Sequence, residues 1–123
     1  MGYESKIIVA VRYKMANCIW FDKLATMDLS RVGGNFRDIF TTEIESNIYG
    51  DGYEPNSSED SYVMTEDKYG DICKYTDVQT VIDWLENAQG NMHYRRFAPA
   101  IAMLKAYMGE VWDGDLVVIH YGY

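Results

Sequence analysis

The chain has 123 residues, of which 48% are hydrophobic, and its 19 acidic and 11 basic residues give a formal net charge of −8 at pH 7. This length and composition fit one globular domain with its own core, and the aromatic content of 15% excludes a disordered chain. The acidic balance argues against non-specific binding to nucleic acid or anionic lipid, and it favours a basic partner.

The sequence carries no signal for export or for insertion into a membrane. Its apolar runs are short, whereas roughly 20 consecutive apolar residues are needed to span a bilayer, and no basic flank with an apolar run opens the N-terminus. Cys18 and Cys73 are isolated thiols, as is typical of a reducing compartment. We therefore expect a cytoplasmic protein without disulfides and without membrane contact.

Two segments near the ends of the chain predict the central strands. Residues 6–13 and 115–121 are rich in β-branched side chains and apolar on both alternating faces, so we pair them at the centre of a sheet. Residues 14–17 predict a turn. The stretch 19–32 fits either a strand or a helix, and the short connection favours a strand that pairs back on the first.

The middle of the chain predicts short elements separated by turn-forming residues. Residues 36–41 predict a short helical turn or irregular structure, 43–49 a strand and 55–61 a loop. Residues 67–70 predict the turn of a hairpin with a strand on each side.

Two helices are predicted between this hairpin and the last strand. The first begins at a capping box in residues 76–79, and it ends at Gly90. Its apolar side chains recur at the spacing of one helix face: Val78, Val81, Ile82 and Leu85. The second spans about 94–108, and Pro99 places its regular start nearer Phe97. Its apolar face is predicted to hold Phe97, Ile101, Leu104 and Met108.

Together these elements predict an α+β fold. We expect a mainly antiparallel sheet of four to six strands, with two helices packed on one face. No internal repeat and no linker divides the sequence, so residues 1–123 form a single domain. The region 43–77 would project from one edge of the sheet.

Residues 43–77 carry the whole net charge of the protein. This segment holds ten acidic and two basic residues and five interleaved tyrosines, whereas the rest of the chain has nine acids and nine bases. Charge that serves solubility alone would be spread over the surface, so its concentration favours a contact surface for a basic protein groove; solubility remains the alternative. The expected contact residues are Tyr53, Glu54, Glu59, Asp60, Tyr62, Glu66, Asp67 and Tyr69.

The acids do not follow the spacing of a metal site. An EF-hand loop that started at Asp51 would place Tyr53 and Pro55 at ligand positions, and the chain has only two histidines, too few for a multi-histidine zinc site. We expect neither a metal nor a cofactor. Neither cysteine lies in a motif that would supply a base, so we predict a binding protein, not an enzyme.

One alternative is a small ligand-binding domain or enzyme that uses His93, Arg95, Arg96 and His120. The two arginines near a predicted helix start would grip a phosphate or carboxylate, and His120 would act as an acid or base. The competing interpretation is that the arginines pair with the protein's own acids and that His120 lies at the edge of the core. A second alternative is an oligomeric accessory protein with its tyrosine-rich surface as the subunit interface.

Three short stretches of the chain resemble small uncharacterised proteins carried by phages and prophages of Gram-positive bacteria. They cover less than a fifth of the chain and are Gly2-Tyr3-Glu4-Ser5-Lys6-Ile7, Tyr94-Arg95-Arg96-Phe97-Ala98-Pro99 and Val117-Val118-Ile119-His120-Tyr121-Gly122-Tyr123. In size, acidity and lack of enzyme motifs the chain is also similar to anti-CRISPR and anti-restriction proteins, although the most extreme DNA mimics are more acidic. The resemblance implies an inhibitor of a nuclease or other nucleic-acid enzyme in the cytoplasm of the host bacterium, and no catalytic residue comes with it.

Overall fold

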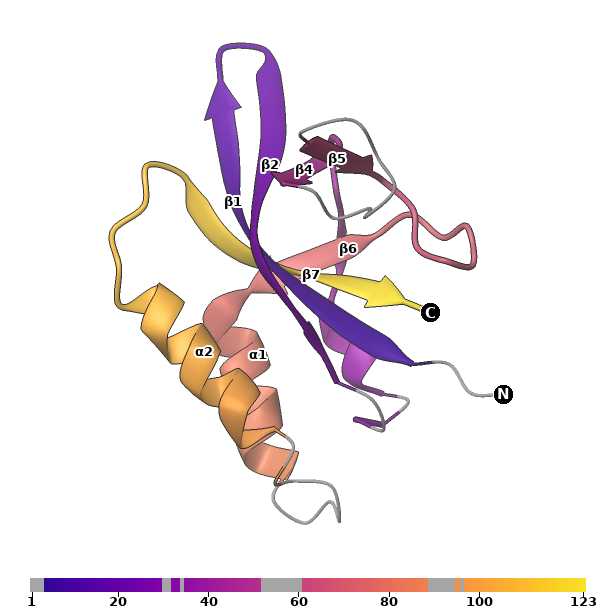
Figure 1. Cartoon of the computed structure of the whole chain (residues 1–123), viewed down its shortest axis with the longest axis vertical. Helices are drawn as coiled ribbons and strands as arrows, with labels where there is room; N and C mark the ends of the chain where they lie inside the picture. Colours follow the sequence, from indigo (N-terminus) through magenta and orange to yellow (C-terminus); the bar gives the residue numbers. More distant parts are fainter. Residues whose placement is uncertain (1–3, 30–31, 34, 52–60, 89–94, 96) are drawn as a thin grey trace.

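A computed structural model shows a curled sheet with two helices packed against it (Figure 1). It describes residues 4–29, 32–33, 35–51, 61–88, 95 and 97–123. The elements in these residues are β1 (Ser5–Met15), β2 (Cys18–Asp28), the 3-10 helix η1 (Phe36–Ile39), β3 (Thr42–Glu43), β4 (Ile48–Asp51), β5 (Ser61–Met64), β6 (Lys74–Asp77), α1 (Val78–Asn87), α2 (Ala98–Met108) and β7 (Asp115–Gly122).

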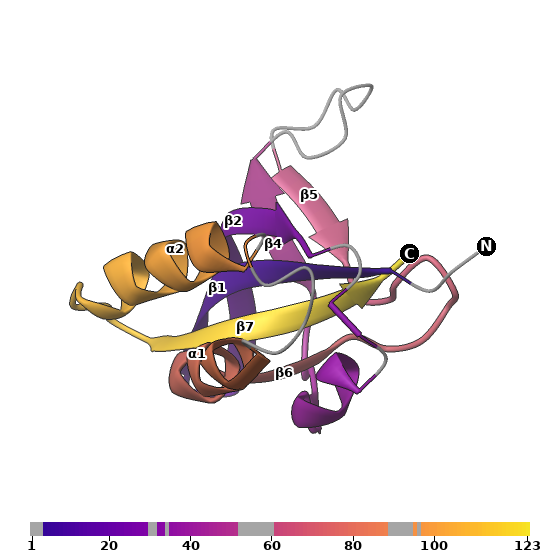
Figure 2. The same cartoon turned by 90° about the horizontal axis from the view of Figure 1, so that it is seen from below.

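The strands of the described residues form one sheet in the order β3-β6-β7-β1-β2-β4-β5. Figure 2 shows β6, β7, β1 and β2 following one another across the view. The predicted α+β class is confirmed, and the sheet has six strands if the two-residue β3 is left aside, within the predicted four to six. All pairs are antiparallel except β2 with β4, which run parallel, so the sheet is mixed.

The predicted pairing of the first and last strands is confirmed at the centre of the sheet. β1 and β7 are antiparallel, with Val9 opposite Val118. The ambiguous stretch 19–32 is a strand as far as Asp28, and it pairs with β1 over its whole length. This register shifts between Val9 and Ala10, and the strand pair therefore contains an irregularity of the β-bulge type.

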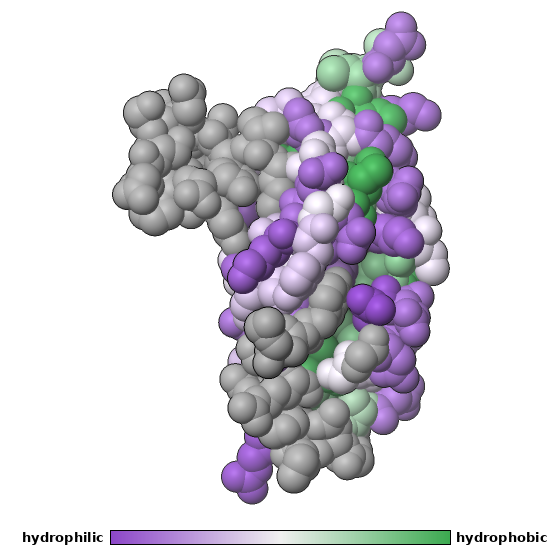
Figure 3. All heavy atoms as spheres, turned by 90° about the vertical axis from the view of Figure 1, so that its right-hand side faces the viewer, coloured by the Kyte–Doolittle hydropathy of each residue, from purple (hydrophilic) through white to green (hydrophobic). Residues whose placement is uncertain are grey.

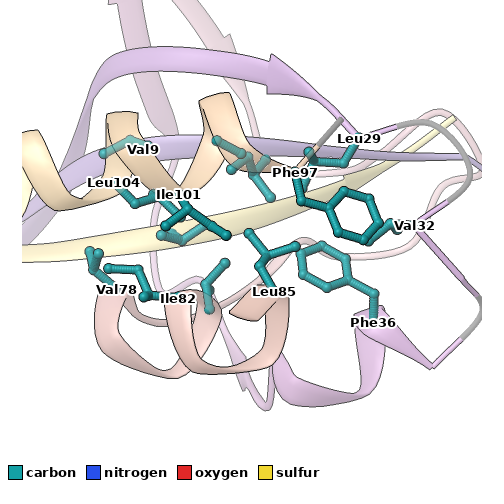
Figure 4. Close-up of a cluster of buried hydrophobic side chains, with 14 of the residues drawn as sticks. Val9, Leu29, Val32, Phe36, Val78, Ile82, Leu85, Phe97, Ile101 and Leu104 are labelled. Atoms are coloured by element: carbon teal, nitrogen blue, oxygen red, sulfur yellow. The ribbon is translucent and has the colours of Figure 1, made fainter. Parts of the chain in front are cut away.

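The helices cover the face of the sheet that carries Ile7, Val9 and Val118, as predicted for two helices on one face. Figure 4 shows side chains of α1 and α2 meeting in this core beside Val9 and Phe36. Four side chains of the predicted α1 stripe are buried: Val78, Val81, Ile82 and Leu85. Phe97, the residue before α2, is buried, as are Ile101 and Leu104 on the helix. Met108 is 43% exposed because the helix ends there and the chain leaves the core.

The predicted capping box of α1 is wrong by one residue. Thr76 is still paired in β6 opposite Val118, so its backbone continues the sheet. Asp77 is the cap, and its carboxylate accepts hydrogen bonds from the backbone N–H of Thr80 at 3.0 Å and from the Thr80 hydroxyl at 2.6 Å. The bond from the hydroxyl is the main cause that holds the pKa of Asp77 below its usual value.

The sheet curls around a second core on its other face. Ile8, Phe21 and Ile119 pack there with Ile44, on the connection from β3 to β4, and with Ile48, the first residue of β4. The five residue steps of that connection reach about 18 Å at most, yet a flat sheet would separate β3 and β4 by five strand spacings, or about 24 Å. The sheet must therefore curl to bring its ends together.

This curl corrects the prediction that residues 43–77 project from one edge. The segment supplies both edges, because β3 and β6 lie at one end of the strand order and β4 and β5 at the other. Residues 65–73 then connect β5 back to β6. The described acidic residues of the segment therefore fall into two groups. Some have a structural role in the curl, and others lie on the exposed connection.

Glu45 fixes the crossing segment inside the curl. Its carboxylate accepts hydrogen bonds from Arg12 on β1 at 2.6 and 3.1 Å and from the Tyr75 hydroxyl on β6 at 3.1 Å. The bonds from Arg12 are the main cause that lowers the pKa of Glu45. Burial, followed by the bond to Glu45, raises the pKa of Tyr75. This acid therefore has a structural role, because its carboxylate binds side chains of two strands.

We expect Glu45→Ala to lower the free energy of unfolding by about 1 kcal/mol, because three hydrogen bonds are lost from a side chain that is 36% exposed. Glu86→Ala is the matched control, since the Glu86–Lys105 pair is more exposed, at 43% and 54%, and should contribute only a few tenths of a kcal/mol. Urea denaturation of both variants measures the difference. Equal losses would contradict the role of Glu45 in closing the curl.

Candidate functional site

Within the described residues of the segment 43–77, residues 65–73 form a compact and largely exposed hairpin, which we call the acidic hairpin. The backbone N–H of Asp67 donates to the Asp71 carbonyl at 2.9 Å, and that of Cys73 donates to the Thr65 carbonyl at 3.1 Å. Glu66 and Ile72 form a bridge between its two sides. The predicted turn at 67–70 is confirmed by the bond from the Gly70 N–H to the Asp67 carbonyl at 3.1 Å. The predicted pairing of the strands on its two sides is wrong, because β5 pairs with β4 and β6 pairs with β3 and β7.

Asp67 holds the turn from inside. Its Oδ1 accepts from the backbone N–H of Tyr69 at 2.9 Å and from that of Asp71 at 3.1 Å. Gly70 takes a left-handed φ of +85°, which a side chain would strain. The N–H of Lys68 donates to the Gly122 carbonyl at 3.0 Å and ties the hairpin to the end of β7. The tip of the acidic hairpin is thus fixed at several points.

This fixed hairpin presents acids together with apolar surface. Glu66 and Asp71 are exposed, and the large side chains of Tyr69 and Ile72 are 52% and 47% exposed. Figure 3 looks at the side of the molecule on which the hairpin lies in Figure 1, and its described surface is mainly hydrophilic with small apolar areas between. A surface that exposes both charged and large apolar side chains is suited to contact with another molecule.

A cavity of about 600 Å³ lies beside the acidic hairpin, and we call it the hairpin cavity. It is lined by residues of η1 and β3, by the hairpin and by His120 of β7. Four carboxylates and two basic side chains contribute to its lining: Asp38, Glu43, Asp67, Asp71, Arg37 and Lys74. The charges around the cavity are therefore mixed, with an excess of acid.

His120 is a buried, neutral histidine. It is 6% exposed, its Nε2 lies 2.8 Å from the Ser5 hydroxyl, and its ring centroid lies 5.2 Å from that of Phe40. Burial lowers the pKa of His120 to about 4, so the imidazole carries no charge at neutral pH. Ser5 is 4% exposed and is not part of the cavity lining, so this pair offers no accessible nucleophile.

Cys73 is an unreactive thiol. It is 3% exposed, and burial, with the nearby charges of Asp67 and Glu66, raises its pKa to about 12. The thiolate that would act as a nucleophile is therefore almost absent at neutral pH.

The acidic hairpin brings together three of the predicted contact residues: Glu66, Asp67 and Tyr69. Four others lie outside the described residues: Tyr53, Glu54, Glu59 and Asp60. Tyr62 lies in β5, and only its backbone is described. The carboxylate of Asp67 accepts hydrogen bonds within the turn. Of these three residues, Glu66 and Tyr69 are therefore the ones that a partner would contact.

The residues of the alternative ligand site are not assembled in the described part of the chain. His93 and Arg96 lie outside it. Arg95 is exposed and does not line the hairpin cavity, whereas His120 does. Arg37 and Asp38 were not predicted as site residues, because nothing in the sequence pattern indicates that η1 would fold beside the hairpin.

Within the described residues, no three His, Cys, Asp or Glu side chains are grouped so that they could hold a metal ion. The helices of the described part are too short or too polar to cross a membrane. Comparison of the chain with protein-family models, with curated proteins and with solved structures finds no match.

Proposed function

We propose that this protein is a small phage-encoded binding protein that inhibits a nucleic-acid-binding enzyme in the cytoplasm of a bacterial host, in the manner of anti-CRISPR or anti-restriction proteins. The observation that carries the proposal is the acidic hairpin, which holds Glu66, Asp71 and Tyr69 exposed on a turn fixed by Asp67. Its partner would be a basic groove that otherwise holds nucleic acid.

The chemistry of the hairpin supports such a partner. Carboxylates attract a basic groove and speed the encounter, and a tyrosine adds flat contact area at a low cost in conformational entropy. The turn is already ordered by hydrogen bonds from Tyr69, Asp71 and Lys68, so little freedom is lost on binding. Asp38 and Glu43 beside the hairpin extend the acidic surface toward β3.

A catalytic role has less support. The pKa of about 4 makes His120 a weak base, and burial leaves the Cys73 thiol protonated at neutral pH. Nucleophilic catalysis requires an accessible nucleophile beside a base, and Ser5, the hydroxyl next to His120, is buried. A binding role, in contrast, requires only the carboxylates that the site exposes.

The test is affinity capture from bacterial lysate at low and high salt, followed by mass spectrometry. We expect one nucleic-acid enzyme to be retained at low salt and released at high salt, because the contact is between exposed charges. The double variant Glu66→Lys and Asp71→Lys should bind this enzyme at least about tenfold more weakly. Adding nucleic acid should relieve the inhibition of the enzyme.

The matched control is the double variant Asp83→Lys and Asp113→Lys, which changes the net charge equally at exposed positions that do not line the hairpin cavity. It should retain the partner and the inhibition. If both double variants bind equally well, or no protein is captured at either salt concentration, the proposal is wrong. Circular dichroism of each variant shows whether the fold has been kept.

A further inference from the structure

The first two strands extend beyond the rest of the sheet as a two-stranded arm, residues 13–20 (Figure 1). β7 pairs with β1 only as far as Arg12, and β4 pairs with β2 at Phe21 and Asp22. Residues 13–20 therefore pair only with each other within the described sheet. Such an arm cannot bury both of its sides in its own domain.

The arm is apolar and basic. Met15 at its tip is 69% exposed, and the rings of Tyr13 and Trp20 stack across the strands with centroids 5.2 Å apart. Lys14 is exposed, and no acidic residue occurs from position 12 to position 21. Arg12 at the base already pairs with Glu45, so Lys14 is the cation that the arm presents to another molecule.

A cavity of about 500 Å³ lies at the start of β7, and we call it the β7-start cavity. Its apolar lining includes Met108 and Trp112, and its carboxylates are Asp77, Glu110 and Asp115. Among the described residues that line it, none is basic. The Trp112 indole N–H donates to the Tyr107 carbonyl at 3.0 Å, which fixes the ring in place.

The arm and the β7-start cavity lie at the same end of the molecule. Asp115 is opposite Arg12 in the sheet, and a Cβ added at Gly114 would collide with the Arg12 carbonyl oxygen, so the loop before β7 packs closely on the base of the arm. The Asp115 carboxylate lies 3.7 Å from the Arg12 guanidinium, yet its side chain is 77% exposed and can meet a second cation. The acidic hairpin is bound instead to Gly122, at the other end of β7. The two ends of this strand thus carry two separate surfaces.

Exposed apolar side chains divide between these two surfaces. In the described residues, the large hydrophobic side chains with high exposure are Met15, Met108 and Val111 near the start of β7 and Tyr69 and Ile72 on the acidic hairpin. Val111 is 96% exposed in the loop beside the β7-start cavity. The apolar surface at the start of β7 is therefore not accounted for by the hairpin's proposed partner.

We propose that a second copy of this chain docks its arm on the β7-start cavity, and that the two copies exchange arms about a two-fold axis. Lys14 of each arm faces Glu110 and Asp115, and Met15 packs against Met108 and Trp112. The charges of the arm and the cavity are opposite, and both features lie at one end, as a self-complementary two-fold interface requires.

The experiment is light scattering after size exclusion, with a reductant present so that the exposed Cys18 forms no cross-link. The wild-type chain should be a dimer. Lys14→Glu places an acid against acids, and Glu110→Lys places a lysine against a lysine. Because each dimer contains the contact twice, each variant alone should dissociate with a constant raised at least about tenfold.

Mixing the two variants is the decisive step of the experiment. In a mixed dimer, the arm of the Lys14→Glu chain meets the lysine introduced by Glu110→Lys, and the unchanged Lys14 of the other chain meets an unchanged Glu110. Both contacts are then attractive, so the dimer should return. Lys68→Glu, at the other end of β7, is the control and should remain dimeric. A monomeric wild type, or a dimer that neither reversal weakens, would overturn the proposal, as would two weakened variants that fail to combine.

Discussion

Phe36→Ala is expected to lower the free energy of unfolding by about 3–5 kcal/mol, as is typical when a large aromatic side chain is removed from a core. Phe36 is 0% exposed, and its ring centroid lies 5.2 Å from that of Phe40 and 5.0 Å from that of Trp84. It belongs to the 3-10 helix η1, whose four residues have no side-chain cap. The packing of this ring, more than local hydrogen bonding, should therefore hold η1 in place.

The consequence reaches the candidate site, because η1 carries Arg37 and Asp38 to the hairpin cavity. Phe36 also lies 6.1 Å from the His120 ring, so a smaller side chain should admit water and raise the pKa of His120 from about 4. Urea denaturation measures the first effect, and NMR titration of the imidazole measures the second.

Phe36→Leu is the matched control, since it keeps an apolar side chain and should cost clearly less than alanine. A loss below about 1 kcal/mol for Phe36→Ala would show that the surrounding residues collapse into the space. In that case η1 would not depend on its aromatic contacts, and the position of Arg37 and Asp38 would need another cause.

The elements that the sequence predicted best are those whose side-chain pattern reports burial directly. β1 and β7 are apolar on both faces because both faces of the sheet are covered, one by the helices and one by Ile44 and Ile48. The apolar stripe of α1 was predictable for the same reason, because its four side chains are the buried ones on that helix. The curl was not predictable, because it depends on which strands neighbour β2 and β6, and the short strands at the edges carry too few residues to indicate a partner.

The candidate site was partly predictable for the same reason. The turn at 67–70 has local chemistry, an Asp that accepts from the backbone and a Gly at positive φ, and it was located from the sequence. The role of Glu45 was not, because its partners Arg12 and Tyr75 are 33 and 30 residues away in the chain. A count of acids cannot separate a carboxylate that binds two strands of the sheet, such as Glu45, from one on the acidic hairpin, such as Glu66.

The second large effect is a loss of stability in mild acid that comes from His120. Its pKa is about 4 in the folded protein against an ordinary 6.5, so between these values the unfolded chain binds more protons than the folded one. The free energy of unfolding should therefore fall as pH is lowered from 6.5 toward 4, by about 3 kcal/mol in total. Well above pH 6.5 the histidine should give no slope.

Two carboxylates add to acid sensitivity only at the lower end of this range. Glu45 and Asp77 have pKa values below their usual 4.5 and 3.8, so the stability they contribute is lost as pH falls below those usual values. Urea denaturation between pH 5 and pH 6.5 therefore separates the contribution of His120 from that of these two carboxylates. His120→Gln keeps a group that can bond to the Ser5 hydroxyl but cannot titrate, and it should remove the slope in this interval.

His93→Gln separates the two histidines of the chain. A slope that disappears with His93 and persists in His120→Gln would contradict the assignment to His120. The absolute stability of His120→Gln is not the readout, because the change also alters packing against Phe36 and Phe40. The slope of the free energy of unfolding against pH depends only on the difference in proton binding between the folded and unfolded chains. It therefore reports the titration of the buried imidazole and not its packing between two aromatic rings.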